Sequence, residues 1–232
     1  MKLICLDTCT CALSVAAMQD GALVSAMWHR AQVNHSVLLM PMLSQMLETL
    51  GWDAKDVDFW AAVSGPGSFT GVRIGVSSVR ALAHGWKKPV VSVNTLEALA
   101  MSFPMERALV VPLLDARRDQ VYAAAYDMTS GFPKEVMPPC AAALDDFLKR
   151  LPEYAAIRFV GDGATAHEET LSAIPNAVVT PEYLQFPMAS AAAPLAQKRA
   201  LEGEICKYDE LEPIYLRDSQ AEQSLKKKEA AR

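Results

Sequence analysis

The sequence predicts an α/β protein of two lobes in which the element order βββαβα occurs twice. Short apolar segments of strand length alternate with helical patterns along the chain. The same succession of elements is found in the first half and again in the second. A strand, a turn with Gly65 and Gly67, and a helix also follow one another directly, as is usual in α/β folds. Such a duplication places a cleft between two lobes.

The first half begins with three strands, predicted at residues 2–7, 11–18 and 22–28. Asp20-Gly21 is a two-residue hairpin signal between the second and third of them. A helix at 36–50, a strand at 58–63, a helix at 69–84, a strand at 89–93 and a helix at 96–103 follow. Pro41 lies inside the first helix and is expected to bend it.

The second half repeats this order in a shorter, proline-rich form. Strands are predicted at 108–114, 120–126, 134–137, 157–161 and 177–180, and helices at 144–151, 167–174 and 189–202. We expect the helix at 189–202 to return to the first lobe. The predicted domains are therefore an N-terminal lobe at 1–103, a smaller lobe at 104–217 and a mobile tail at 218–232, which contains three consecutive lysines at 226–228.

Composition indicates a cytoplasmic protein. The 232 residues are 51% hydrophobic with a net charge of −5, so no overall field draws the protein onto nucleic acid or an anionic membrane. No apolar run is long enough to span a membrane. The first strand carries Asp7 and lacks a cleavage site for a signal peptide. Five cysteines, an odd number, are typical of reduced thiols.

Two loops of the first half have features of phosphate-binding loops. The first strand ends in Asp7 and Thr8, with Thr10 close behind, and glycines at 65 and 67 precede the helix at 69–84. Such turns let backbone N–H groups approach an anion. The glycine spacing matches neither the dinucleotide fingerprint nor the Walker loop. A tight turn that only packs helix against strand is the alternative interpretation.

Five segments together carry a resemblance to a known family. They are Leu6-Asp7-Thr8-Cys9-Thr10, residues 64–75, Asn34-His35-Ser36, residues 114–122 and Pro213-Ile214-Tyr215-Leu216-Arg217. In these segments the chain resembles the TsaB (YeaZ) family, bacterial partner proteins in tRNA threonylcarbamoyladenosine synthesis. This family is related to TsaD (Kae1) and to the actin-like ATPase superfamily.

The resemblance implies an actin-like ATPase (ASKHA) fold with a reduced second lobe, and a non-catalytic role. The chain would bind and activate a TsaD-like catalytic subunit, with a TsaE-like ATPase as third member. It would form a homodimer when alone and reach tRNA indirectly through the complex. No cofactor is expected, although weak ATP or ADP contact within the complex stays open. The residues Asp7, Thr8, Thr10, Gly65 and Gly67 would then be vestigial phosphate loops.

No catalytic residue and no metal site are expected. In TsaD-like subunits two histidines on the helix after the last strand of the first lobe bind a metal, whereas this chain has Thr95 and Leu99 there. An actin-like small-molecule kinase or ATPase is the main alternative function. It would need a second phosphate loop, for which the nearest candidate is the Gly161-Asp162-Gly163 turn. A glycoprotease-type metallopeptidase is the less favoured alternative.

The helices at 36–50 and 69–84 are the predicted pairing surface. The first is apolar on nearly all sides and rich in methionine, and the second has a small-residue face. The family resemblance also assigns pairing to these helices; the alternative is that both pack only on their own sheet. Leu39, Met42, Met46, Val72 and Val76 are expected at the centre of the interface. The full predicted set is His35, Ser36, Leu39, Met42, Leu43, Met46, Gly71, Val72, Arg73, Gly75, Val76 and Val79.

Overall fold

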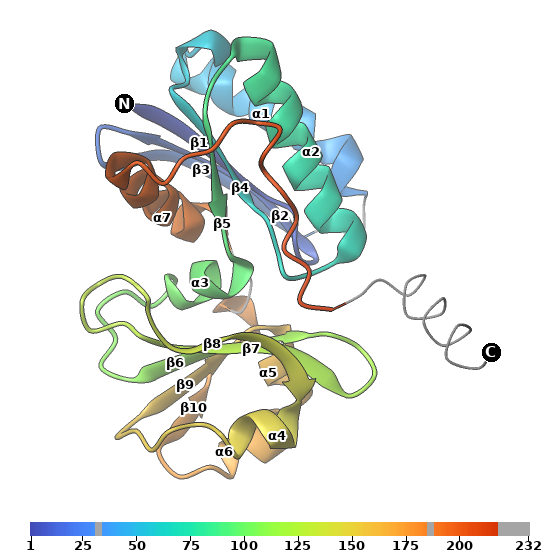
Figure 1. Cartoon of the computed structure of the whole chain (residues 1–232), viewed down its shortest axis with the longest axis vertical. Coiled ribbons are helices and arrows are strands. Elements are labelled where there is room, and N and C mark those ends of the chain that lie inside the picture. The colour runs from blue at the N-terminus through green and yellow to red at the C-terminus, as the bar shows by residue number, and fades with distance from the viewer. Residues whose placement is uncertain (31–33, 185–187, 218–232) are drawn as a thin grey trace, which may run out of the picture.

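The structure is a computed structural model that describes residues 1–30, 34–184 and 188–217, and it contains two five-stranded sheets (Figure 1). The first sheet is formed by β1 (Lys2–Asp7), β2 (Ala12–Gln19), β3 (Ala22–Arg30), β4 (Phe59–Val63) and β5 (Val90–Val93). The second is formed by β6 (Leu109–Asp115), β7 (Gln120–Asp127), β8 (Lys134–Ala143), β9 (Ile157–Val160) and β10 (Ala177–Val179). The predicted tail at 218–232 lies outside the described residues.

The two sheets share one topology, which confirms the duplication expected from the sequence. The first sheet has the order β3-β2-β1-β4-β5, and the second has the equivalent order β8-β7-β6-β9-β10. In each sheet the first three strands pair antiparallel, and the following strands add in parallel. The central strands β1 and β6 are therefore buried on both sides, as their continuous apolar character requires.

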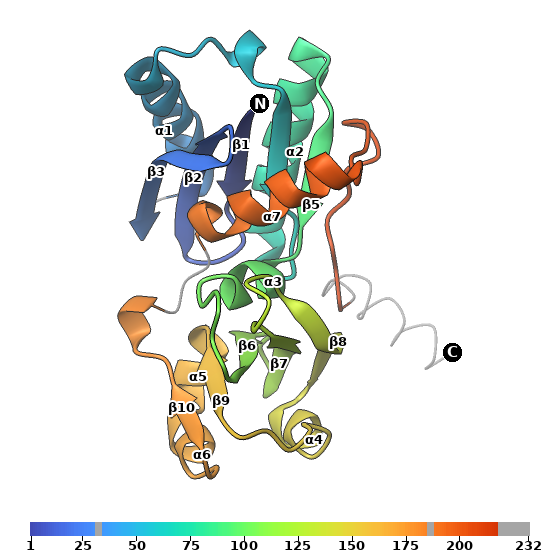
Figure 2. The same cartoon turned by 90° about the vertical axis from the view of Figure 1, so that its left-hand side faces the viewer.

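The first sheet lies between two helical layers. The helices α1 (His35–Leu50) and α2 (Phe69–Trp86) cover one face, and α7 (Ala189–Glu202) crosses the other (Figures 1 and 2). Their buried side chains meet those of the strands in one continuous core, because each helix has an apolar stripe at helical spacing. The segment 189–202 therefore packs against β1 and β2, far from it in sequence.

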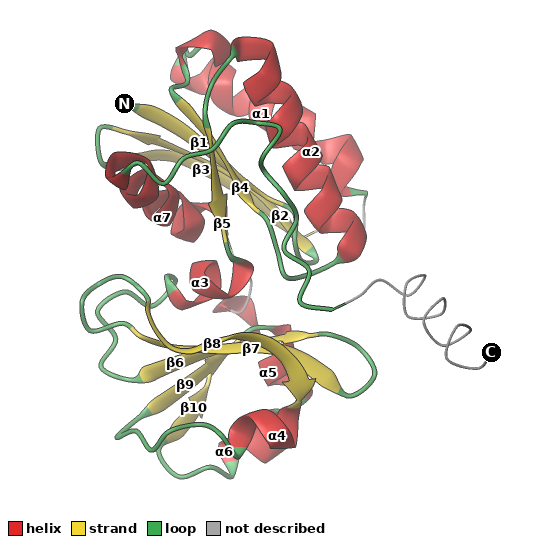
Figure 3. Cartoon of the chain, in the orientation of Figure 1, coloured by secondary structure: helices red, strands yellow, loops and turns green. Residues whose placement is uncertain are grey.

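The second sheet is covered more thinly. The short helices α4 (Leu144–Leu148), α5 (Asp162–Ala166) and α6 (Glu168–Ser172) pack on one face. The helix α3 (Thr95–Ala100) packs on the other and lies between the two sheets (Figure 3). Two 3-10 turns, η1 (Ala54–Asp56) and η2 (Glu182–Leu184), complete the secondary structure of the described residues.

Several element boundaries differ from the predictions for local reasons. The strand predicted to end at residue 137 continues through Pro138 and Pro139 to Ala143, because β8 is an edge strand, where proline costs no ladder hydrogen bond. The single helix predicted at 167–174 is replaced by α5 and α6. Gly161, at φ +107°, turns the chain sharply so that α5 starts directly after β9.

The helix α2 continues past the predicted end. Gly85 lies inside it, and Lys87 in the left-handed conformation ends it at φ 54°. The helix α1 continues across the exposed Pro41 to Leu50. Within the described residues, no helix is long and apolar enough to cross a membrane.

Candidate functional site

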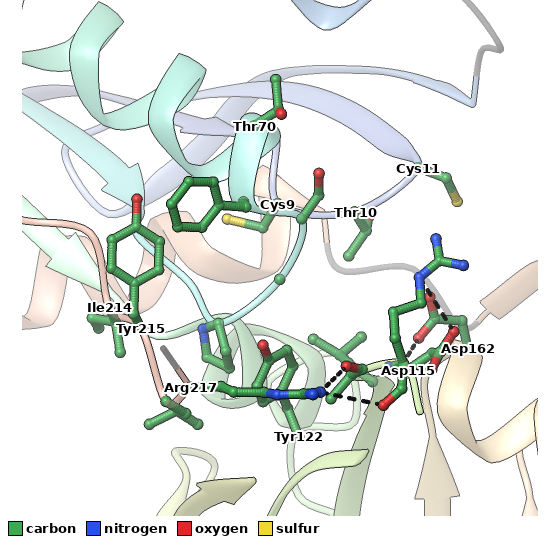
Figure 4. Close-up of a pocket in the computed structure, with 18 of the residues that line it drawn as sticks. Cys9, Thr10, Cys11, Thr70, Asp115, Tyr122, Asp162, Ile214, Tyr215 and Arg217 are labelled. Atoms are coloured by element: carbon green, nitrogen blue, oxygen red, sulfur yellow. Dashed lines mark hydrogen bonds and ion pairs between the residues drawn. The ribbon is translucent and has the colours of Figure 1, made fainter. Parts of the chain in front are cut away.

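A cleft of about 810 Å³ lies between the two sheets (Figure 4). Residues 9–11 and 66–70 form its first-sheet wall, and residues 114–118 face them from the second sheet. Residues 214–217 also line it. Of the five predicted phosphate-loop residues, Thr10 and Gly67 line the cleft, whereas Asp7, Thr8 and Gly65 are not among its lining residues.

Asp7 is fully buried at the end of β1. The Cys9 N–H donates a hydrogen bond to its Oδ1 (2.9 Å), and Oδ2 has no hydrogen-bond partner. Burial raises the pKa of the Asp7 carboxyl from 3.8 to about 7, and the Cys9 N–H only partly opposes this. A carboxyl with this pKa is about half protonated at pH 7 and is fully buried, which is unlike an exposed, ionised metal or phosphate ligand.

Thr8 bonds to the helix that follows the glycine turn. Its hydroxyl donates to the Gly71 carbonyl oxygen (2.6 Å), 63 residues away in sequence. A Cβ at Gly71 would collide with the Thr8 carbonyl oxygen, and a Cβ at Gly75 would lie 2.5 Å from the Thr8 hydroxyl. The two glycines therefore let α2 pack directly on the end of β1.

The glycine turn is bonded to the same segment. The Ser68 N–H donates to the Cys9 carbonyl oxygen (2.7 Å), and a Cβ at Gly67 would collide with that oxygen. This N–H group, at the N-cap of α2, is thus occupied by the chain itself rather than directed at an anion. The geometry favours the packing interpretation of the glycines over a phosphate-binding one.

This packing leads to a prediction for nucleotide binding. Isothermal titration of the purified protein with ATP and Mg²⁺ is expected to show no binding tighter than about 1 mM, about 4 kcal/mol weaker than a micromolar site. Thr10 lines the cleft, so Thr10→Val is the matched variant. Micromolar binding that is lost in Thr10→Val would contradict the prediction and support the kinase alternative.

The counterpart turn of the second sheet is also closely packed. A Cβ at Gly161 would collide with the Leu113 carbonyl oxygen, and one at Gly163 would lie 3.0 Å from it. The Asp115 N–H donates to Asp162 Oδ1 (3.0 Å), and burial raises the pKa of Asp162. As the sequence indicated for a plain strand-to-helix turn, the glycines make room for β6.

The two residues that stand in place of the expected metal-binding histidines lie in buried, apolar surroundings. Thr95 and Leu99 on α3 are fully buried, and Leu99 packs with Leu96 and Val110. Across the described residues, no group of three or more His, Cys, Asp or Glu side chains is arranged to hold a metal ion.

The predicted pairing residues divide into buried and accessible ones. His35 and Met42 are half-buried, and Ser36 and Arg73 are exposed. The other eight are buried: Leu39, Leu43, Met46, Gly71, Val72, Gly75, Val76 and Val79.

This burial corrects the predicted centre of the interface. Leu39, Met46, Val72 and Val76 are at most 2% exposed, because the stripe that repeats at helical spacing packs on the sheet. Leu39, Met46, Val72 and Val76 are therefore not available to a partner. His35 and Arg73 also have partners within the chain: the His35 ring bonds to the Thr10 carbonyl (2.8 Å), and Arg73 bonds to the Tyr215 hydroxyl.

Part of the accessible surface of the two helices is a groove lined by Met40 of α1 and by residues of α2. It has a volume of about 400 Å³ and is lined by Met40, Ser77, Ser78, Ala81, Leu82, Gly85 and Trp86. Met40 and Trp86 are 47% and 43% exposed. Sequence reasoning found the methionine-rich helix and the small-residue face of the second helix, but its interface set left out Met40 and Trp86, and the predicted helix end at residue 84 excluded Trp86.

Comparisons with known proteins agree on one family. The family model described as TsaD, tRNA N6-adenosine threonylcarbamoyltransferase, matches residues 29–225. The tRNA threonylcarbamoyladenosine biosynthesis protein TsaB of Escherichia coli (strain K12) is 30% identical over 236 residues, covering 99% of this chain and 100% of its own. The structure of YeaZ from Pseudomonas aeruginosa has a TM-score of 0.82 at 29% identity, covering 93% of this chain and 99% of its own.

A more distant likeness concerns the fold alone. The ethanolamine utilization protein EutJ from Carboxydothermus hydrogenoformans has a TM-score of 0.53 at 12% identity, covering 82% of this chain and 89% of its own. The actin-like ATPase fold expected from the resemblance is confirmed.

Proposed function

Because the chain belongs to the TsaB (YeaZ) family and has a role in tRNA threonylcarbamoyladenosine biosynthesis, we propose that it is a non-catalytic subunit that binds and activates a TsaD-like partner. A TsaE-like ATPase is the third member of the complex, and tRNA is reached through the TsaD-like subunit. Without that partner, the same surface pairs two copies of the chain. The complex acts in the cytoplasm.

The observation that carries this proposal is the apolar groove between α1 and α2. Met40 of α1 and Trp86 at the C-terminal end of α2 line the groove and are 47% and 43% exposed, and Val37, one turn before Met40, is 61% exposed. Exposed apolar side chains gathered in a hollow are typical of interaction sites.

The groove suits a helix of a related fold. Ser77, Ala81 and Gly85 are small, so a partner helix can approach closely and gain dispersion contacts. Met40 adapts to more than one partner surface, and a tryptophan is a frequent anchor of binding energy. An interface of standard size buries about 800 Å² on each partner.

The cleft supports a non-catalytic role. Its loops are bonded to one another: the Thr8 hydroxyl and the Ser68 N–H, at the start of α2, both have partners within the chain. Activity therefore depends on the partner subunit, with this chain acting through its surface.

The test places a charge in the groove. Met40→Glu and Ala81→Glu are each expected to abolish capture of a TsaD-like subunit and to give a monomer by light scattering, because an unpaired carboxylate in a desolvated interface costs several kcal/mol. Both positions are exposed, so circular dichroism should remain unchanged. Val76→Glu is not a suitable test, since Val76 is 2% exposed and its charge would unfold the core.

The matched control is Leu201→Glu. Leu201 is an apolar side chain of α7, 73% exposed, on the opposite face of the first sheet (Figure 2). This variant should keep both the dimer and the capture of the partner. Loss of capture in Leu201→Glu together with its retention in Met40→Glu would refute the assignment of the groove.

A further inference from the structure

Residues 213–217 are the last described segment, and residues 214–217 line the cleft (Figure 4). Leu211, 1% exposed, anchors the start of this segment in the core of the first sheet. The Ile214 N–H then donates to the Ser64 carbonyl oxygen (2.7 Å) at the end of β4. Gly65 leaves room for this approach, because a Cβ there would lie 2.5 Å from the Ile214 carbonyl oxygen.

Tyr215 attaches the segment to the first turn of α2. Its ring stacks on Phe69, with ring centres 4.8 Å apart. The Arg73 Nε donates to the Tyr215 hydroxyl (3.0 Å), and the Arg73 guanidinium lies 3.9 Å from the centre of the Phe69 ring. These contacts order the segment along the first-sheet wall of the cleft.

Arg217 reaches the second sheet. Its Nη1 donates to the carbonyl oxygens of Ala116 (2.7 Å) and Arg117 (3.3 Å), which belong to the β6–β7 hairpin. Hydrogen bonds from a guanidinium are stronger than those between neutral groups. Arg217 thus links the segment that is bound to the first lobe with the β6–β7 hairpin of the second sheet.

The sheets are also joined at other points. The helix α3 packs on the second sheet directly after β5 of the first, and an exposed Arg30–Glu182 ion pair (2.8 Å) joins β3 to η2. Exposed pairs contribute little. Phe132 of the β7–β8 loop also packs against the core of the first sheet, and Arg199 of α7 pairs with Glu97 of α3 (2.8 Å). These contacts lie outside the lining of the cleft, so the lobes can still open at the cleft by rotating about them, and an attachment across the cleft opposes this rotation.

We propose that residues 213–217 are a built-in strap that sets how far the two lobes close. The strap holds the β6–β7 hairpin against the first-sheet wall through Arg217. Since Phe69 and Arg73 belong to α2, the strap also fixes the orientation of this groove-bearing helix relative to the second sheet.

The test compares Arg217→Ala with the native full-length chain by small-angle X-ray scattering and hydrogen exchange, in the same oligomeric state. The variant should have a larger radius of gyration. The amides of Ala116 and Gln120, which are bonded across the hairpin, should exchange about tenfold faster, whereas those of β9 keep their rates. Faster hairpin exchange without a change in scattering would show a merely local role and overturn the proposal.

Arg150→Ala is the matched control, because the Arg150 Nε also bonds a backbone carbonyl, that of Asp146 (3.2 Å), but within one lobe. It should leave the scattering curve unchanged, and an equal expansion in this control would overturn the proposal. If Arg217→Ala does not fold, Tyr215→Ala decides by the same two readouts, since it removes the stack on Phe69 and leaves the second sheet untouched.

Discussion

Gly71→Ala is expected to lower the free energy of unfolding by about 3 kcal/mol or more, because the new methyl group has no room to relax. It would collide with the Thr8 carbonyl oxygen, which is backbone and cannot rotate away. A movement of α2 away from Thr8 that relieved this collision would break the hydrogen bond from the Thr8 hydroxyl to the Gly71 carbonyl (2.6 Å). Urea denaturation followed by circular dichroism measures the loss.

Gly85→Ala is the matched control in the same helix. A Cβ at Gly85 meets nothing within 4 Å, so alanine there should stabilise the protein by up to about 1 kcal/mol through helix propensity. The two substitutions are chemically identical, and only the contact with Thr8 separates them. Equal effects of both variants would mean that the loop of residues 7–10 and α2 are not packed as described.

Asp7→Asn is expected to make stability less dependent on pH. The folded pKa of Asp7, about 7, is above its ordinary value of 3.8. The folded protein therefore binds this proton more tightly than the unfolded chain. The stability contributed by the proton is fully present below about pH 4 and is lost as the pH rises to about 7.

The size of the effect follows from the shift. About three pKa units correspond to about 4 kcal/mol, and asparagine does not titrate. From pH 4 to pH 8, the stability of Asp7→Asn relative to the native protein should rise by up to that amount. The unpartnered Oδ2 position would hold an amide NH₂ at a cost of about 1–3 kcal/mol, which is the same at every pH.

Asp53→Asn is the control for this pH series. Hydrogen bonds from the Lys55 backbone and side chain lower the pKa of Asp53, which is at the surface. The stability of Asp53→Asn relative to the native protein should therefore fall slightly as the pH rises, which is opposite to the change expected for Asp7→Asn. Denaturation curves of the three proteins at pH 4, 6 and 8 suffice. A constant difference between Asp7→Asn and the native protein would show that Asp7 is not a buried, raised-pKa acid.

Both experiments probe the same junction between β1 and α2. If Gly71 and Asp7 behave as expected, loops that resemble phosphate loops serve to join the sheet to the helix that carries the groove. The proposed role would then rest on a rigid surface for a partner rather than on a nucleotide bound in the cleft.

The sequence by itself determined the architecture. Apolar segments of strand length, helical stripes and the Asp20-Gly21 hairpin are local signals, and they predicted most elements and the order βββαβα in both halves, whereas the strand order within each sheet came from the structure. Local signals failed where context decides. Proline in β8 is tolerated only because that strand is at the edge of its sheet. Gly85 lies inside α2, and it is Lys87, in the left-handed conformation, that ends the helix.

Only the tertiary structure decided which surface is free. On α1 and α2 nearly every side is apolar or small, so periodicity did not distinguish the face on the sheet from the face toward a partner. Packing of α1 against β2 and β3, and of α2 against β4 and β1, buried Leu39, Met46 and Val76 and left Met40 and Trp86 outside. The strap was likewise invisible in the sequence, because Arg217 and Ala116 are 101 residues apart and only the folded chain brings them together.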